Sequence, residues 1–188
     1  MVFRHLARIK MKKEPILIAL ALVGIGIAGR LMPHYPNATP ITTLALAGKR
    51  YLGRRWSLTL PIVAMLASDF IIGFYNWRVM ASVYGSFFLV GLLSWCLKKN
   101  SGPIAFGIVA LVSSLLFFLV TNFAVWLLYP WYAKSFAGLI YCYTLGIPFL
   151  RNMIIGDLLY TSALLGAGKL IGYTRLYMFK QHPRIAVL

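Results

Sequence analysis

The chain has 188 residues, of which 61% are hydrophobic and only 12% are charged, and its formal net charge is +16. A soluble domain of this size has roughly a quarter of its residues charged, so the composition excludes an ordinary soluble protein. It predicts a single integral membrane domain covering residues 1–188. The positive charge does not indicate nucleic-acid binding, because the basic residues lie in short clusters between apolar runs, as in membrane-protein loops that face anionic lipid.

Apolar segments follow one another along the chain. The first, Pro15 to Met32, comes after a basic segment (residues 1–14) and has the order of a signal peptide, but it continues into RLMPHYPN without a clear cleavage site, so we expect it to be retained. The later segments are Pro40 to Gly53, which is short and weak, Ser57 to Tyr75, Met80 to Leu97, Pro103 to Tyr129 and about Phe149 to Tyr173. The aromatic interval 130–149 could form a short helix in the membrane interface or a cap on the bundle. With about 20 apolar residues needed per span, the pattern predicts an all-α membrane protein with a six-transmembrane-helix bundle.

The basic residues predict the orientation of this bundle. If the amino terminus lies inside, fifteen of the nineteen lysines and arginines fall in inside segments, and only Arg30, Arg78, Lys134 and Arg151 fall outside. Cytoplasmic loops carry the excess of Lys and Arg. We therefore expect both termini, including the tail 174–188, in the cytoplasm, and a multi-pass protein of a bacterial inner membrane. The same bias supports a spanning second segment.

Polar side chains from separate segments fall in the outer half of the predicted membrane. They are Asp69, Asn122, Arg151, Asn152 and Asp157. Charged groups inside a membrane are costly and often mark a function. We expect these residues to line one polar pocket, in which Arg151 neutralises an aspartate or a ligand carboxylate. Each has a structural interpretation too, because a buried aspartate can hold a bundle together and an asparagine can join two helices.

Two further groups of residues have a functional and a structural interpretation. Trp77, Trp126 and Tyr129 lie at the outer ends of their segments, where they could form the rim of the pocket or the aromatic belt of a membrane protein. Gly24 and Ala28 form a pair of small residues four apart, which lets another helix approach closely. That helix could belong to this chain or to another membrane subunit.

The sequence offers little for catalysis. The three histidines, His5, His34 and His182, lie in terminal segments and a loop, without the spacing of metal ligands. Cys96 and Cys142 lie in different apolar runs and form no recognisable motif. We therefore expect no enzyme activity, no metal and no cofactor.

Four stretches carry a resemblance to known proteins: RLMPHYPNATPITTLALAGKRYLGRRW, LASDFIIGFY, LFFLVTNFAVW and FLRNMIIGDLLYT. Together they resemble a group of small bacterial membrane proteins of uncharacterised function. That group looks like the substrate-binding S components of energy-coupling-factor (ECF) vitamin transporters. The signature positions of the group correspond here to Asn37, Thr39, Pro40, Asp69, Gly73, Asn122, Arg151, Asn152, Gly156 and Asp157.

The resemblance implies an S-component-like function. A vitamin-like small molecule would bind near the outer face, and the first helix would meet a transmembrane coupling subunit driven by ATPases. The usual helix-one motif of S components is Ala-x-x-x-Ala, whereas this chain has Gly24-x-x-x-Ala28. Two other functions stay open: a solitary proton-coupled transporter of small solutes, in which Asp157 takes up the proton, and a structural membrane protein without a ligand.

Overall fold

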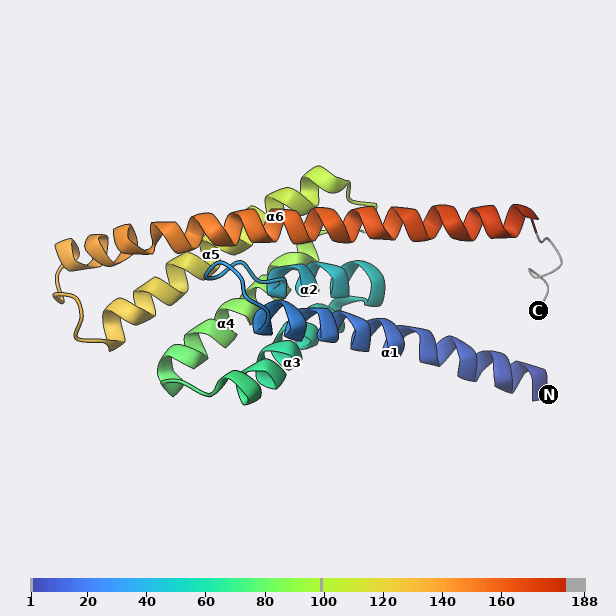
Figure 1. The fold of residues 1–188 in the computed structure, drawn as a ribbon, viewed down its shortest axis with the longest axis horizontal. Helices are drawn as coiled ribbons and strands as arrows, with labels where there is room; N and C mark the ends of the chain where they lie inside the picture. Colours follow the sequence, from blue (N-terminus) through green and yellow to red (C-terminus); the bar gives the residue numbers. More distant parts are fainter. Residues whose placement is uncertain (1, 99, 182–188) are drawn as a thin grey trace.

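Helices make up all the regular structure in the described part of the chain (Figure 1). The computed structural model describes the backbone of residues 2–98 and 100–181, and the side chains of residues 15–98 and 100–168. Its α-helices are α1 (Val2–Leu31), α2 (Ile41–Ala47), α3 (Arg54–Ile72), α4 (Trp77–Leu93), α5 (Pro103–Leu128) and α6 (Phe136–Gln181). A π-helical turn, Gly48–Leu52, follows α2, and a 3₁₀ turn, Ser94–Cys96, follows α4. The predicted all-α fold is confirmed.

Successive helices run in opposite directions between two ends of the molecule (Figure 1). The end that carries the α1–α2 loop (residues 32–40) and the α3–α4 turn (residues 73–76) is called the loop end. The other end, which carries the π-helical turn and the loop 97–102, is called the basic end. Figure 1 shows that α1 starts and α6 finishes at the basic end, and that the α5–α6 hairpin reaches beyond the other helices at the loop end.

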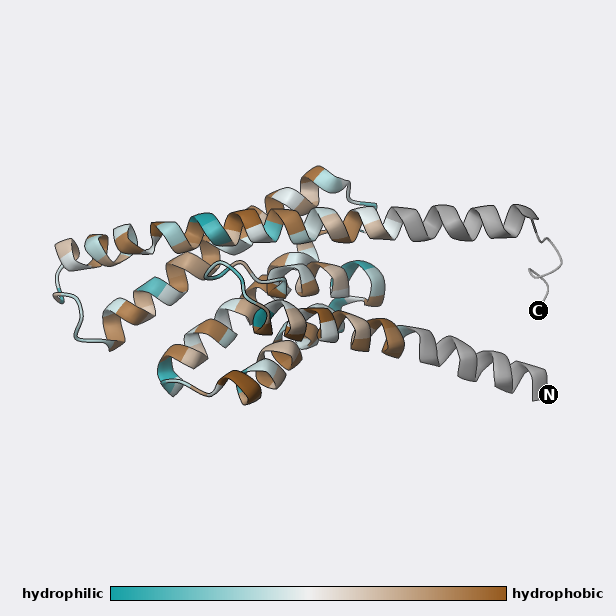
Figure 2. Ribbon diagram, viewed as in Figure 1, coloured by the Kyte–Doolittle hydropathy of each residue, from teal (hydrophilic) through white to brown (hydrophobic). Residues whose placement is uncertain are grey.

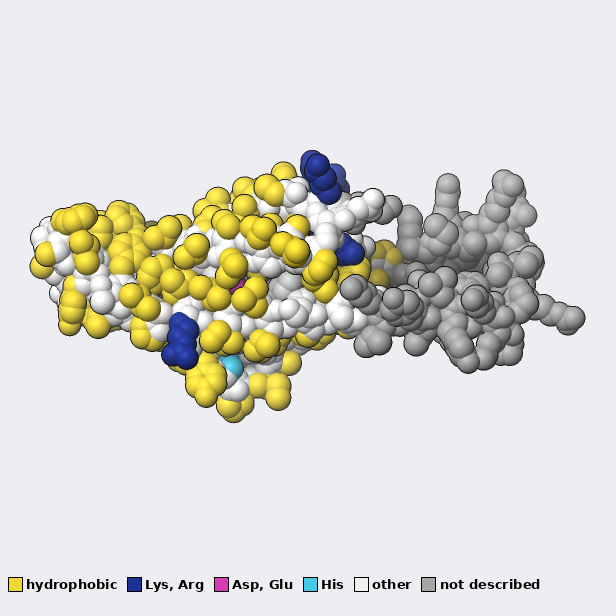
Figure 3. Space-filling view, turned by 90° about the horizontal axis from the view of Figure 1, so that it is seen from above, with side chains coloured by type: hydrophobic (Ala, Val, Ile, Leu, Met, Phe, Trp, Pro, Cys, Tyr) yellow, Lys and Arg dark blue, Asp and Glu magenta, His cyan; other side chains and the backbone are white. Residues whose placement is uncertain are grey.

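Four of the described helices are long and apolar enough to cross a membrane. They are α3, α4 with its 3₁₀ turn, α5, and residues Phe136–Gly168 of α6, while the apolar part of α1, Pro15–Leu31, is shorter. Hydrophobic residues predominate along these helices (Figure 2), and hydrophobic side chains cover much of the described face in Figure 3, which also shows a few separate groups of Lys and Arg side chains. These features indicate a multi-pass membrane protein.

The second predicted span differs from the expectation. Here α2 has seven residues and the π-helical turn five, so together they rise about 18 Å, against about 30 Å for the hydrocarbon core of a bilayer. Pro40 precedes the helix, and Gly53, with a φ of 108°, ends the π-helical turn. All seven residues of α2 are buried, because the other helices surround it. Four of the described helices are therefore long enough to span a membrane on their own, and the six-span bundle stays a prediction.

The aromatic interval 130–149 does not form the separate short helix or cap that its sequence allows. Residues from Phe136 onward belong to α6 without a break, although Pro148 lies inside the helix. The reason is packing against α5: the Tyr143 hydroxyl donates a hydrogen bond to the Leu119 carbonyl at 2.8 Å. Gly146 lies directly against Phe118 and Asn122, where a Cβ atom would be 2.6 Å from the asparagine oxygen.

Small residues set how closely α1 approaches its neighbours. A Cβ atom on Gly26 would lie 2.5 Å from a Leu44 methyl and 3.0 Å from the Ala64 Cβ. Ala19 and Leu22 are buried on the same face of α1, since residues three and four apart share a helix face. This packing places the end of α1 beside α3, and it positions the site described next.

Candidate functional site

Asp69 forms an ion pair with Arg30 near the loop end. The Arg30 Nη1 lies 2.7 Å from the Asp69 Oδ1, and the side chain of Asp69 is only 1% exposed. The same nitrogen donates to the Ser68 hydroxyl at 2.6 Å, and the Tyr84 hydroxyl donates to the Asp69 Oδ2 at 2.7 Å. Asp69 is therefore neutralised by Arg30, and the prediction that Arg151 could do so is wrong for this carboxylate. The charge pattern indicates an outer position for Arg30, and the packing of α1 on α3 brings it alongside Asp69.

Arg30 keeps hydrogen-bonding capacity for another group. Every hydrogen bond shown for it in the described structure, including one to the Met65 carbonyl at 3.3 Å, leaves from Nη1. A guanidinium carries five N–H donors, so those on Nε and Nη2 stay available to an acceptor. The Arg30 side chain is 15% exposed, and Arg30 lines a cavity.

This loop-end cavity has a volume of about 380 Å³, within the usual range of about 300–1,000 Å³ for ligand pockets. It is lined by polar groups of Arg30, His34, Asn37, Thr39 and Tyr75, and by the apolar side chains of Met65, Ile72, Val83, Phe87, Phe117 and Met153. The wall thus combines an apolar floor with a few polar groups beside a fixed cation. Such a lining suits a small molecule that has both an acceptor group and an apolar body.

Two polar groups of the cavity wall have defined roles. Burial raises the pKa of Tyr75 to about 12, and the negative charge of Asp69 adds to this effect. The Tyr75 hydroxyl is therefore a neutral donor at physiological pH. The His34 Nδ1 lies 2.6 Å from the Met32 carbonyl, a contact that fixes the ring and leaves Nε2 free to face a ligand.

Arg151 and Asn152 lie in a separate groove of about 670 Å³ between α6 and the α1–α2 loop. The loop sits directly on α6, because a Cβ atom on Gly156 would be 2.9 Å from the Ala38 Cα. Arg151 is exposed and forms no ion pair with the described side chains. His34 borders both this groove and the loop-end cavity.

Asp157 lies deeper in α6 and is 1% exposed. Its Oδ2 accepts a hydrogen bond from the Ser114 hydroxyl at 2.7 Å. The Thr42 hydroxyl lies near this carboxyl but makes no hydrogen bond of normal geometry within the described structure. No described Lys or Arg pairs with Asp157, so this carboxyl is buried without a visible counter-charge.

The other predicted residues lie elsewhere. Asn122 donates to the Phe118 carbonyl of its own helix at 2.9 Å and packs against α6, which fits its structural interpretation. Trp77 is 68% exposed at the start of α4. Trp126 donates to the Ala133 carbonyl, and Tyr129 stacks on Trp131 with 4.2 Å between ring centroids. None of these side chains lines the loop-end cavity or the groove beside it.

Comparison with known proteins gives a family. Residues 10–181 match a family of unknown function, DUF6580. The chain belongs to this family. The membership bears out the expectation of an uncharacterised family, and nothing in it supports a likeness to ECF S components. No curated protein and no solved structure matches the chain.

In this DUF6580 protein the predicted site is divided. Asp69 pairs with Arg30 beside the loop-end cavity. Arg151 and Asn152 line the separate groove, and Asp157 is buried between the helices. Sequence reasoning missed Arg30, Tyr84 and Tyr75, although a single arginine at the end of an apolar run was a visible signal. The pairing of that arginine could not be read from spacing, since its partner lies far along the chain on another helix.

Gly24 and Ala28 of this DUF6580 chain are both exposed on α1. A Cβ atom on Gly24 would meet no other atom within 4 Å. The buried face of α1 is instead the one that carries Gly26.

Proposed function

We propose that this protein is the small-solute-binding subunit of a membrane importer, with its ligand in the loop-end cavity. The proposal rests on Arg30: its Nη1 is held by Asp69, Ser68 and Met65, and the residue lines the cavity with the donors on Nε and Nη2 not used by these contacts. A cation fixed in this way can donate hydrogen bonds to the carboxylate or carbonyl of a ligand without rearrangement. That preorganisation lowers the entropy lost on binding.

The ligand class follows from the wall of the cavity. Arg30 and the neutral Tyr75 hydroxyl offer donors, and Phe87 and Phe117 offer apolar ring faces. An unmatched buried polar group costs about 1–3 kcal/mol, so the ligand needs acceptors opposite these donors. A vitamin-like molecule, with an acidic or carbonyl group on a flat apolar body, meets both requirements.

The proposed setting is a bacterial inner membrane with the loop end outside and both termini in the cytoplasm. The chain would then cross six times, with α2 crossing inside a shell of protein. Short or irregular segments are tolerated at membrane depth when protein buries them, and all seven residues of α2 are buried. The exposed face of α1 with Gly24 and Ala28 would bind a transmembrane coupling subunit that is driven by ATPases.

Copurification tests the solute site. The protein is purified in mild detergent, and bound small molecules are identified and quantified by mass spectrometry. Tyr75→Phe removes one hydroxyl from the cavity wall and should lower ligand occupancy about tenfold. Tyr129→Phe, at a residue outside the cavity, is the matched control and should leave occupancy unchanged. The absence of any bound molecule, or an equal loss in both variants, would count against the proposal and in favour of a structural membrane protein.

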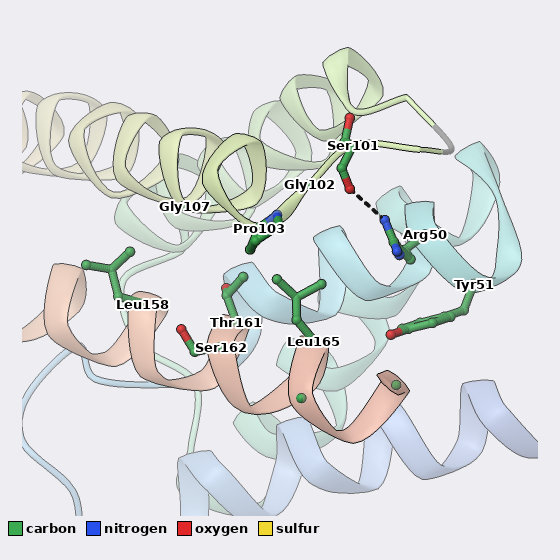
Figure 4. Close-up of a pocket in the computed structure, with 12 residues that line it drawn as sticks. Arg50, Tyr51, Ser101, Gly102, Pro103, Gly107, Leu158, Thr161, Ser162 and Leu165 are labelled. Atoms are coloured by element: carbon green, nitrogen blue, oxygen red, sulfur yellow. Dashed lines mark hydrogen bonds between the residues drawn. The ribbon is translucent and has the colours of Figure 1, made fainter. Parts of the chain in front are cut away.

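A solitary proton-coupled transporter is the second candidate, and one arrangement on α6 favours it. Asp157 lies four residues after Met153 and four before Thr161. Met153 lines the loop-end cavity, and Thr161 lines a cleft at the basic end (Figure 4). The buried Asp157 lies between them and faces only the hydroxyls of Ser114 and Thr42, with no charged group of the described chain against it. A proton on Asp157 would thus lie one helical turn from a residue that lines each hollow.

Reconstituted liposomes distinguish the two candidates. If Asp157 carries the proton, a pH gradient drives uphill solute uptake without ATP, and Asp157→Asn abolishes that uptake while solute binding persists. Uptake that needs an added coupling subunit and ATP, with Asp157→Asn still active, would favour the importer subunit.

A further inference from the structure

Two adjoining hollows lie toward the basic end, on the other side of Asp157 from the loop-end cavity. The first, the basic pocket, has a volume of about 250 Å³ and is lined in part by Lys49, Arg50 and Lys98. The second, the basic-end cleft, has a volume of about 520 Å³ and runs between the loop 97–102, α5 and α6 (Figure 4). Arg50 and Tyr51 line both hollows, so the two hollows adjoin at these side chains.

The basic pocket is strongly positive. Three basic residues border it, and no described Asp or Glu pairs with any of them. Arg50 is held in place, because its Nη1 donates to the Ser101 carbonyl at 3.0 Å and its guanidinium lies 5.2 Å from the centre of the Phe106 ring. Figure 4 shows the contact with Ser101 at the mouth of the cleft.

The start of α5 adds to the positive potential. Gly102 caps this 26-residue helix without a side-chain hydrogen bond to the first turn. The free N–H groups of a helix N-terminus favour an anion. Ser101, Gly102 and Pro103 line the cleft, which places this helix end beside Arg50.

Away from that positive end the basic-end cleft is mainly apolar, with small residues in its wall, although Thr161 and Ser162 of α6 also line it. Gly107 of α5 faces Leu158 of α6, where a Cβ atom on the glycine would lie 4.0 Å from a leucine methyl. Leu165 and Gly166 continue the wall along α6. Figure 4 shows Leu158 and Leu165 pointing from α6 toward the start of α5. The cleft therefore offers a mainly apolar groove beside a cluster of cations.

We propose that this site binds one anionic phospholipid of the membrane leaflet at the basic end. The phosphate lies among Lys49, Arg50 and Lys98 at the start of α5, and one acyl chain follows the cleft between α5 and α6. Basic pockets between membrane helices bind anionic headgroups in this manner. The lipid site shares no lining residue with the proposed solute cavity. An experiment can therefore disprove the lipid proposal without disproving the solute proposal, and the reverse.

Lipid retention tests this site. The protein is exchanged into nanodiscs that contain a phosphatidylglycerol and phosphatidylcholine mixture, and the lipids kept after release into mild detergent are counted by native mass spectrometry. The double change Arg50→Gln and Lys98→Gln should lower phosphatidylglycerol retention about tenfold or more. The matched control is Arg54→Gln with Arg55→Gln, which removes the same charge from the same end but from neither hollow. Equal loss in the two double variants would overturn the proposal, because general attraction would then explain retention.

The acyl-chain part needs its own variant. Gly107→Leu fills the cleft without a change in charge and should displace phosphatidylglycerol, while thermal unfolding in detergent shows that the variant is folded. Inorganic phosphate, added as a soluble competitor, should displace the lipid only weakly. If phosphate competes as well as phosphatidylglycerol does, or if the folded Gly107→Leu protein keeps its lipid, the assignment to a phospholipid is wrong.

Discussion

Arg30 and Asp69 together show how a charge is accommodated inside this bundle. The aspartate is buried, and it receives one ionic contact from Arg30 and one hydrogen bond from Tyr84. A buried ion pair adds little net stability over an apolar pair of similar volume, but loss of one partner leaves an uncompensated charge. Under the proposed function, the pair serves to fix Arg30 at the cavity that it lines.

This interpretation gives a prediction for three variants. Arg30→Met and Asp69→Leu should each lower the free energy of unfolding by about 3–5 kcal/mol. The double variant should lie within about 1–2 kcal/mol of the wild type, because it removes both charges together. Unfolding in mixed detergent micelles measures all three. Additive losses would show that the two residues act independently, and Arg78→Met, at an exposed arginine of the same end, should have little effect.

At the scale of elements, α1 has two faces with opposite requirements. Gly26 lies against Leu44 of α2 and Ala64 of α3, whereas Gly24 meets no other part of the described chain. A side chain at position 26 must displace its neighbours, and a side chain at position 24 enters open space. Whatever covers the face with Gly24 in the membrane, be it lipid or another subunit, is not a helix of the described chain.

Leucine substitutions on α1 separate packing from partner binding. Gly26→Leu should lower the free energy of unfolding by at least about 1–3 kcal/mol through overpacking. Gly24→Leu should change it by no more than about 0.5 kcal/mol, yet it should weaken copurification of a coupling subunit if that subunit uses this face. Thermal unfolding and pull-down of a tagged protein from its own membranes measure the two effects. An unfolded Gly24→Leu protein would place this face inside the bundle.

The sequence predicted the long helices well and the short or joined ones poorly. Pro103 to Tyr129 was expected as one segment, and α5 covers Pro103–Leu128, because its apolar run is long and has clear ends. The second segment has too few residues for hydropathy to define its length, and its burial depends on the helices around it. Likewise, Pro148 marked a break in the pattern, but contacts of α6 with α5 keep the helix continuous.

The candidate site could be predicted only in part. Asp69 was found because a carboxylate in an apolar run needs a partner, and its burial agrees with that reasoning. The identity of the partner depends on how α1 packs on α3 rather than on position along the chain. For the same reason Asn122, chosen by its depth in the membrane, and Tyr129, chosen by its place at the outer end of a segment, lie outside the loop-end cavity.

At the scale of the whole molecule, the apolar part of α6 is longer than the thickness of the membrane core. The apolar part of α6 has 33 residues, which corresponds to about 50 Å, against a hydrocarbon core of about 30 Å. A helix of this length must tilt or extend beyond the bilayer core. The stacked Tyr129 and Trp131 lie at the protruding end of the hairpin, and rings of this kind favour the headgroup layer.

The native cysteines allow the proposed orientation to be tested in intact membranes. Cys96 is exposed in the 3₁₀ turn at the basic end, whereas Cys142 is buried. In a Cys142→Ala protein, a membrane-impermeant maleimide should label Cys96 in inside-out vesicles and not in right-side-out vesicles, because the cluster of basic residues favours the cytoplasmic side. As the matched control, Ser135→Cys in a protein without the native cysteines places one thiol in the α5–α6 loop. It should show the opposite pattern, and labelling of both positions from the same side would rule out the alternating arrangement in the membrane.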